Sequence, residues 1–132
     1  MKDDKNNLTD LTGKSNHITS PELEKSKVQI IVEIIEYVPN AIVSKTIIKK
    51  TTGNITVSSL AIGEELAEKT SPFDNFIQII DGAAEVIIKE KKYNLKIGEG
   101  IIIPAHTAYC FNAKEQFKMI STVIKSGYED LM

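Results

Sequence analysis

Residues that bind metals or form cross-links are scarce in this sequence. Its 132 residues include two histidines, His17 and His106, a single cysteine, Cys110, and no tryptophan. Because many metal sites use three histidines, a count of two excludes such a site within one chain. One cysteine likewise excludes an internal disulfide, which agrees with a reducing compartment.

Long apolar runs and a charge excess of one sign are missing as well. No apolar run approaches the roughly 18 residues that a membrane-spanning helix needs, and the first residues lack the apolar stretch of a signal peptide. Sixteen basic residues stand against 18 acidic ones, so the net charge of −2 offers no basic surplus for nucleic acid. We therefore expect a cytoplasmic protein that binds neither a membrane nor nucleic acid.

What the sequence does contain is the composition of one ordinary domain. Hydrophobic residues make up 42% of the chain and charged residues 26%, as in soluble globular proteins, and 132 residues leave no room for a second core. Residues 1–20 are mostly Lys, Asp, Asn, Thr and Ser, which bury too little apolar surface to offset the entropy of ordering. We expect a disordered tail at 1–20 and a folded domain at 21–132.

The segment before the first clear strand is ambiguous. Ser20 and Pro21 are typical of the N-cap and the first position of a short helix. Apolar residues between Val28 and Tyr37 fit both a helical stripe and one face of a strand, and we expect a strand that runs into a helical turn. The prediction for this part is a short helical or irregular segment.

From residue 41 onward, short runs of β-branched and alternating residues are separated by turn residues. The pair Asp81-Gly82 is typical of a turn that ends a strand. Roughly eight to ten strands with short connections and no helical crossovers predict an all-β fold, an antiparallel jelly-roll β-barrel. The expected strands cover residues 42–49, 55–62, 76–80, 84–89, 92–97, 101–103, 109–113 and 117–125.

The middle of the chain resembles the two sequence motifs of the cupin superfamily. Gly63 and Gly82 occupy the two glycine places of the first motif, and Gly98 and Pro104 occupy the first glycine place and the proline place of the second. The short spacer between the motifs is similar to that of compact single-domain bacterial cupins. This resemblance implies a small cupin barrel that forms a homodimer.

The metal-ligand places of those motifs hold different residues here. In the family, three histidines and a glutamate bind a divalent metal that supports oxygen, isomerase or decarboxylation chemistry. In this chain Lys69 and Ser71 stand at the first two histidine places, Asn75 at the glutamate place and Tyr109 at the last histidine place. Since none of the four is a strong metal ligand at neutral pH, we expect a cupin without a metal cofactor.

Those four residues are candidates for ligand binding. If the family geometry holds, Lys69, Ser71, Asn75 and Tyr109 point into one cavity and offer an ammonium, a hydroxyl, an amide and a phenol to a small polar or anionic molecule. His106, in the turn after Pro104, could line the mouth of that cavity. A lysine with a lowered pKa could act as a base or form a Schiff base, so catalysis stays open, although we assign no catalytic residue.

Alternatives from other classes remain. Lys69 could extend into water while Asn75 and Tyr109 satisfy backbone groups. The chain could be a metal-dependent enzyme of dioxygenase or isomerase type. Its ligand set would then be built around His106 and completed by Asp74, Cys110 or a second subunit. If Cys110 is not a ligand, we expect it to be a buried, inert thiol that faces away from Tyr109. It could also be a structural or regulatory dimer whose barrel is filled by Ile77, Ile79, Val86, Ile88, Phe111 and Met119.

Overall fold

The computed structural model describes residues 22–125, so the tail predicted at 1–20 and the helix start predicted at Ser20 and Pro21 lie outside the described residues. The regular secondary structure of the described part is nearly all strand, as predicted. It contains one 3-10 turn, η3 (Ile31–Glu33), and eight strands: β2 (Ile42–Lys50), β3 (Gly53–Leu60), β4 (Glu65–Lys69), β5 (Asp74–Ile88), β6 (Lys91–Lys96), β7 (Gly100–Ile103), β8 (Tyr109–Asn112) and β9 (Phe117–Ile124).

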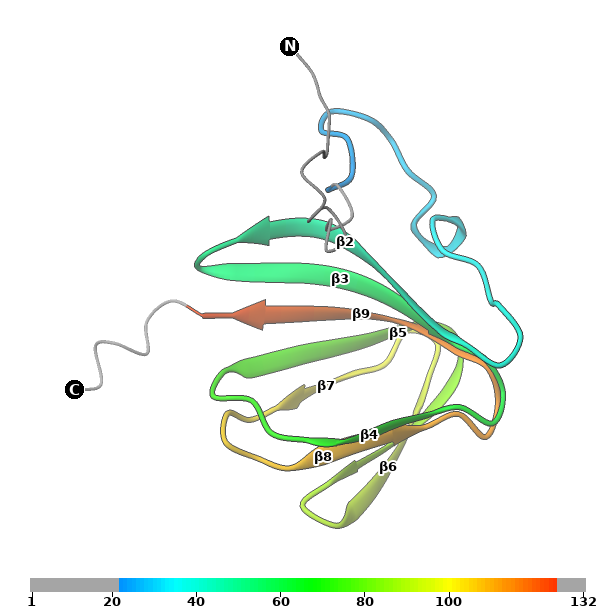
Figure 1. Cartoon of the computed structure of the whole chain (residues 1–132), viewed down its shortest axis with the longest axis vertical. Helices are drawn as coiled ribbons and strands as arrows, with labels where there is room; N and C mark the ends of the chain where they lie inside the picture. Colours follow the sequence, from blue (N-terminus) through cyan, green and yellow to red (C-terminus); the bar gives the residue numbers. More distant parts are fainter. Residues whose placement is uncertain (1–21, 126–132) are drawn as a thin grey trace, which may run out of the picture.

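Two curved antiparallel sheets share the long strand β5 (Figure 1). The first part of β5 pairs with β9 and β7, which gives a first sheet in the order β2-β3-β9-β5-β7. The second part of β5 pairs with β8 and β6, which gives a second sheet in the order β4-β8-β5-β6. The sheets converge near the middle of β5 and diverge where β5 and β8 begin, an end that we call the open end.

The strand expected to end at Asp81-Gly82 does not end there, so that prediction is wrong. β5 continues for 15 residues, and its pairing with β9 shifts by one residue between Ile79 and Asp81. Gly82 has a φ of 72°, a backbone conformation that glycine adopts without steric cost. A Cβ atom at this position would collide with the backbone carbonyl of Gln116. The Asp-Gly pair therefore bends β5 from one sheet into the other.

Two other segments differ from expectation. β4 was not predicted, because the sequence Glu65-Leu-Ala-Glu-Lys69 has no β-branched or aromatic residue to signal a strand. Among residues 22–41 no strand forms, and only the helical turn η3 is confirmed. The short connections expected between strands include two tight hairpins, β2–β3 with its turn at residues 51–52 and β5–β6 with its turn at residues 89–90.

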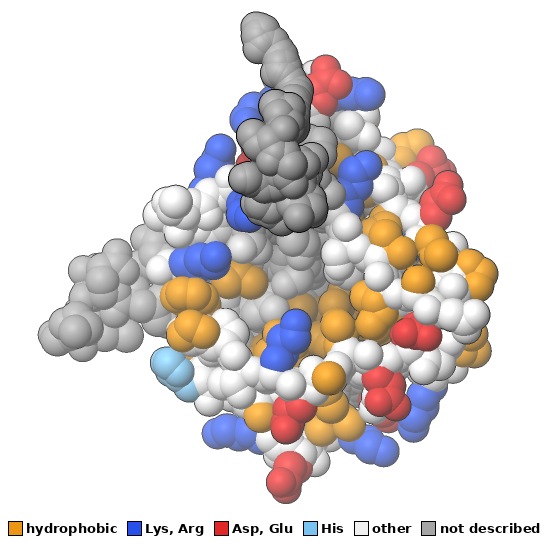
Figure 2. Space-filling view, viewed as in Figure 1, with side chains coloured by type: hydrophobic (Ala, Val, Ile, Leu, Met, Phe, Trp, Pro, Cys, Tyr) orange, Lys and Arg blue, Asp and Glu red, His pale blue; other side chains and the backbone are white. Residues whose placement is uncertain are grey.

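The space between the sheets holds one apolar core. Figure 2, in the same view, shows hydrophobic side chains gathered along the middle of the molecule. The rings of Tyr109 and Phe111 meet edge to face with centroids 5.9 Å apart, and Phe111 packs against Phe117 at 6.2 Å. The buried cluster includes all six residues that the structural alternative requires: Ile77, Ile79, Val86, Ile88, Phe111 and Met119.

The segment before β2 lies on the outer face of the first sheet, where Ile35 is buried and several polar contacts hold the chain. The Ser59 hydroxyl donates a hydrogen bond to the carbonyl of Glu36 (2.9 Å), and the Lys118 ammonium donates one to the carbonyl of Val32 (2.6 Å). The Tyr37 hydroxyl donates to a carboxylate oxygen of Asp81 at 2.5 Å. Across residues 22–125, no helix has both the length and the apolar character that crossing a membrane requires.

Candidate functional site

A band of hydroxyl groups crosses the inner face of the first sheet. On β3, Ser58 lies opposite core residue Met119 of β9, and its other neighbour is Ser44 of β2. Residues directly opposite in antiparallel strands share one face of the sheet, so these side chains point inward. The two serine hydroxyls are hydrogen-bonded at 2.8 Å. One row closer to the open end, Thr56 of β3 lies opposite Ser121 of β9.

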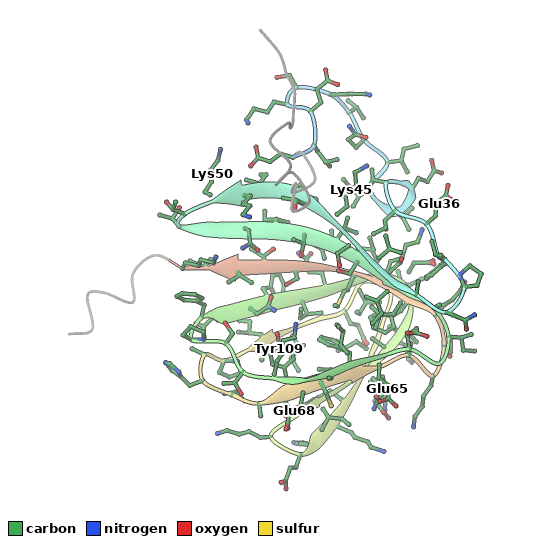
Figure 3. The ribbon with its side chains drawn as sticks, viewed as in Figure 1. Glu36, Lys45, Lys50, Glu65, Glu68 and Tyr109 are labelled. Carbon is green, nitrogen blue, oxygen red and sulfur yellow. The ribbon has the colours of Figure 1, made fainter. Side chains whose placement is uncertain are left out.

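Asn75 and Tyr109 complete this band from two different sheets. Asn75 lies near the start of β5 in the first sheet, and Tyr109 begins β8 in the second sheet, opposite Ile88 of β5. Their exposed fractions are 7% and 8%. The Ser121 hydroxyl donates to Oδ1 of Asn75 at 2.7 Å, and the Asn75 amide hydrogen-bonds the Tyr109 phenol. Figure 3 shows Tyr109 in the space between the two sheets.

The Tyr109 phenol is a neutral group at physiological pH. Burial raises its pKa above the ordinary value, because the charged phenolate loses solvation. The hydrogen bond with Asn75 acts in the opposite direction and offsets only part of this rise. Tyr109 is therefore available as a hydrogen-bond donor, and it is a poor anionic ligand for a metal.

The other three candidates lie at the rim of the open end. Lys69 is the cross-strand partner of Tyr109 in the β4–β8 pair, and its side chain is exposed. The Ser71 hydroxyl accepts a hydrogen bond from the backbone N–H of Phe73 (3.1 Å), so this hydroxyl is used within the turn at residues 71–73. His106 is exposed, has a φ of 62°, and its backbone N–H donates to the Ser71 carbonyl at 2.6 Å.

The structure thus brings Asn75 and Tyr109 into contact and places Lys69 on the neighbouring strand. It does not place the Ser71 hydroxyl in that contact, and the backbone hydrogen bond of His106 joins it to Ser71 rather than to Asn75 or Tyr109. Four hollows lined by described residues lie elsewhere: between the N-terminal segment and β2, at and beside the β2–β3 hairpin tip, and beside β6 and β7.

Comparison with solved structures places this architecture in a family. A conserved protein of unknown function from Streptococcus pyogenes superimposes with a TM-score of 0.76 at 28% identity, over 83% of this chain and 96% of that one. A cupin superfamily protein from Desulfitobacterium hafniense gives 0.74 at 23% identity, over 80% and 96%. A cupin 2 conserved barrel domain protein from Leptotrichia buccalis gives 0.70 at 30% identity, over 71% and 46%. The chain belongs to the cupin superfamily. Neither a family model nor a curated protein sequence matches it.

The residues at this cupin's metal places do not fit a divalent cation. Oδ1 of Asn75 already accepts a hydrogen bond from Ser121, the Tyr109 phenol keeps its proton, and Lys69 carries a positive charge. Within residues 22–125, no three His, Cys, Asp or Glu side chains gather in a way that could hold a metal ion.

Within residues 22–125, His106, Asp74 and Cys110 do not gather into the alternative ligand set, whereas completion of that set by a second subunit stays a prediction. Oδ1 of Asp74 accepts a hydrogen bond from the backbone N–H of Ala105 (2.8 Å). Cys110 lies opposite Ile87 on the outer face of the second sheet, and it is partly exposed rather than buried. Its outward direction is as predicted. Burial and the neighbouring carboxylates of Glu68 and Glu65 raise the pKa of its thiol, so it resists ionisation.

Sequence reasoning missed the serine part of the band. Asn54, Thr56 and Ser58 repeat every second residue along β3, a period that marks one face of a strand. That alternation was a usable signal, but it does not say which face is inside. Ser44 and Ser121 become part of the band only through the cross-strand register, which local sequence does not encode.

Proposed function

We propose that this cupin domain binds a small polar or anionic molecule at the open end of its barrel, without a metal ion. The observation that carries the proposal is the buried contact between Asn75 and Tyr109, set within a band of inward-facing serines. Inward positions of a small barrel are normally apolar, as they are in the deep part of this one. Polar groups at the open end add nothing to apolar packing, and they suit a hydrated binding site.

Each residue would have a distinct task in binding. The Tyr109 hydroxyl donates a hydrogen bond, and the serine hydroxyls of Ser44 and Ser58 can donate or accept. Lys69, exposed at the rim beside Tyr109, supplies a positive charge for a carboxylate or phosphate group. This set of groups suits sugars and small organic acids. No reaction is assigned, because among residues 22–125 no histidine or carboxylate hydrogen-bonds with Asn75 or Tyr109.

A thermal-shift screen with sugars and small organic acids tests the proposal. We expect at least one compound to raise the melting temperature of the natural protein, since a ligand at a hundred times its Kd adds about 2.7 kcal/mol of stability. The same compound should have little effect on Asn75→Leu, which removes the amide, while Ser71→Ala serves as the control at the rim. No stabilising compound, or equal stabilisation of Asn75→Leu, would refute the proposal.

The absence of a metal is tested separately by elemental analysis. Untagged protein from cells supplied with iron, manganese, nickel and zinc should carry less than about a tenth of a metal ion per chain, because tight sites retain their ions through purification. A stoichiometric metal would restore the alternative of a metal-dependent enzyme.

The homodimer implied by the family resemblance is also a proposal, and the first sheet supports it. Its outer face exposes apolar side chains on three strands: 43% of Ile48 on β2, 42% of Phe76 on β5 and 57% of Ile124 on β9. Such a patch suits pairing with a second copy of the chain. Sedimentation should give a dimer for the natural protein and a monomer for Ile124→Lys. A natural protein that sediments as a monomer would contradict the pairing.

A further inference from the structure

A hollow of about 450 Å³ lies on the side of the barrel, beside β6 and β7. Within the described residues, β6 and β7 are the outermost strands of their sheets, and each pairs only with β5. They pair with different halves of β5, so the two sheets separate between them. The hollow is within the size range of small-molecule pockets, roughly 300–1,000 Å³.

The floor of the hollow is apolar and continuous with the core. Ile88 belongs to the buried cluster, and Ile101 and Tyr93 are partly buried against it. Ile102 and Pro104 form the exposed wall on the β7 side. A ligand with an apolar body would therefore cover hydrophobic surface that water now contacts.

Two lysines line the same hollow and give it a positive rim. Lys89 lies in the turn before β6, and Lys91 begins β6 with its ammonium 5.4 Å from the centre of the Tyr93 ring. Within residues 22–125, neither ammonium has a carboxylate within ion-pair distance. The next lysine, Lys92, forms an ion pair with Glu85 at 3.8 Å and does not line the hollow.

We infer that this side hollow is a second binding site, for an amphipathic organic anion. Its apolar body lies on Ile88, Ile101 and Pro104, and its carboxylate lies at the rim beside Lys89 and Lys91. The charge complements the two lysines, and the apolar body complements the floor. The lining of this hollow includes neither Asn75 nor Tyr109, although Ile88 on its floor is the cross-strand partner of Tyr109, and the inference does not rest on the proposed function.

Calorimetric titration with three simple probes tests the inference. Octanoate carries both an apolar chain and a carboxylate, 1-octanol lacks the charge, and acetate lacks the chain. We expect octanoate to bind most tightly, octanol more weakly and acetate not measurably. Raising the salt concentration to about 1 M should weaken octanoate binding and leave octanol binding unchanged, because the Debye length falls to about 3 Å.

Variants of the lining residues test whether octanoate binds in this hollow. The double variant Lys89→Gln/Lys91→Gln should weaken octanoate binding at least about fivefold and leave octanol binding unchanged. Lys96→Gln, which removes the same charge from an exposed position on β6 outside the hollow, is the matched control and should bind octanoate normally. Ile102→Glu places a negative charge at the exposed wall, which repels the octanoate carboxylate, and should also weaken octanoate binding.

The results distinguish this site from the open end of the barrel. Asn75→Leu should bind octanoate as the natural protein does, whatever that variant does to sugars and small acids. Failure of octanoate to bind, unchanged binding by the double variant, or loss of binding in Asn75→Leu would each overturn the inference.

Discussion

At the scale of single residues, two tyrosines keep their protons well above neutral pH. Burial is the main cause for both, since it removes solvation from the charged phenolate. For Tyr37, the hydrogen bond to the Asp81 carboxylate and the negative charge of that group raise the pKa further. For Tyr109, the hydrogen bond with Asn75 lowers the pKa and so offsets part of the rise that burial causes.

These raised pKa values predict that the protein loses stability in alkali. The unfolded chain releases its tyrosine protons near the ordinary pKa of about 10, whereas the folded chain holds them. The free energy of unfolding should therefore fall as the pH rises above that value. Melting temperatures between neutral and alkaline pH should decline less steeply for Tyr37→Phe than for the natural protein. An equally steep decline in Tyr37→Phe would contradict this account, with Tyr93→Phe as the control.

Glu85 predicts a loss of stability in acid. It is almost fully buried on the outer face of the second sheet, where Asn112 donates a hydrogen bond (3.1 Å) and the Lys114 ammonium lies at 3.1 Å. The Asn112 hydrogen bond first, and then Lys114, lower the pKa of its carboxyl. A lowered pKa stabilises the fold above the ordinary carboxyl pKa of about 4.3, and this stabilisation disappears as the pH falls through the folded value.

The corresponding variant is Glu85→Gln. We expect it to melt at a lower temperature than the natural protein at neutral pH, and the difference should shrink as the pH falls below about 4. Glu90→Gln, an exposed substitution at the β5–β6 turn, is the matched control and should change little at any pH. A difference that persists undiminished in acid would show that packing, rather than charge, explains the effect.

The candidate site was only partly predictable at this scale. Asn75 and Tyr109 were found because they occupy family motif positions, and their contact follows from strands that face each other across the barrel. Ser71 was assigned by the same logic, yet its hydroxyl caps a local turn, which motif spacing cannot reveal. Ser121 contacts Asn75 through the pairing of β9 with β5, a register set by tertiary packing.

At the scale of elements, the bend in β5 gives a sharp prediction. Gly82→Ala adds a Cβ at positive φ and drives it into the Gln116 carbonyl, so we expect roughly 2–4 kcal/mol of destabilisation in urea unfolding. Gly63→Ala has a similar φ of 89° but no atom within 4 Å of its Cβ. It should cost only about 1–2 kcal/mol. Equal costs at the two sites would show that backbone conformation alone, and not the close approach of β9, fixes Gly82.

Most elements were predictable because their inward residues alternate with polar ones. The errors have physical causes. An Asp-Gly pair can bend a strand as well as end it, and only the partner strands β9 and β8 decide which occurs. β4 forms despite poor intrinsic propensity because it pairs with β8 and places Leu66 against Phe111. Tertiary pairing overrides local preference at both places.

At the scale of the whole molecule, the barrel has three distinct regions. Its deep part is filled by apolar side chains, its open end carries the Asn75–Tyr109 contact and the serine band, and its side has an apolar hollow with two lysines. A purely structural dimer requires a filled core, and the deep part of the barrel meets that requirement. The same alternative gives no function to the polar groups at the open end, so these groups favour ligand binding there.

A crystal structure of the untagged protein is the sharpest test of ligand binding at the open end. We expect ordered water or a retained small molecule at the open end, within about 2.7–3.2 Å of the Tyr109 hydroxyl or a serine hydroxyl of the band. We also expect no metal ion bound to Asn75 or Tyr109. A dry open end, closed by the protein's own side chains and with neither water nor ligand bound to these hydroxyls, would contradict ligand binding there and leave the structural alternative in its place.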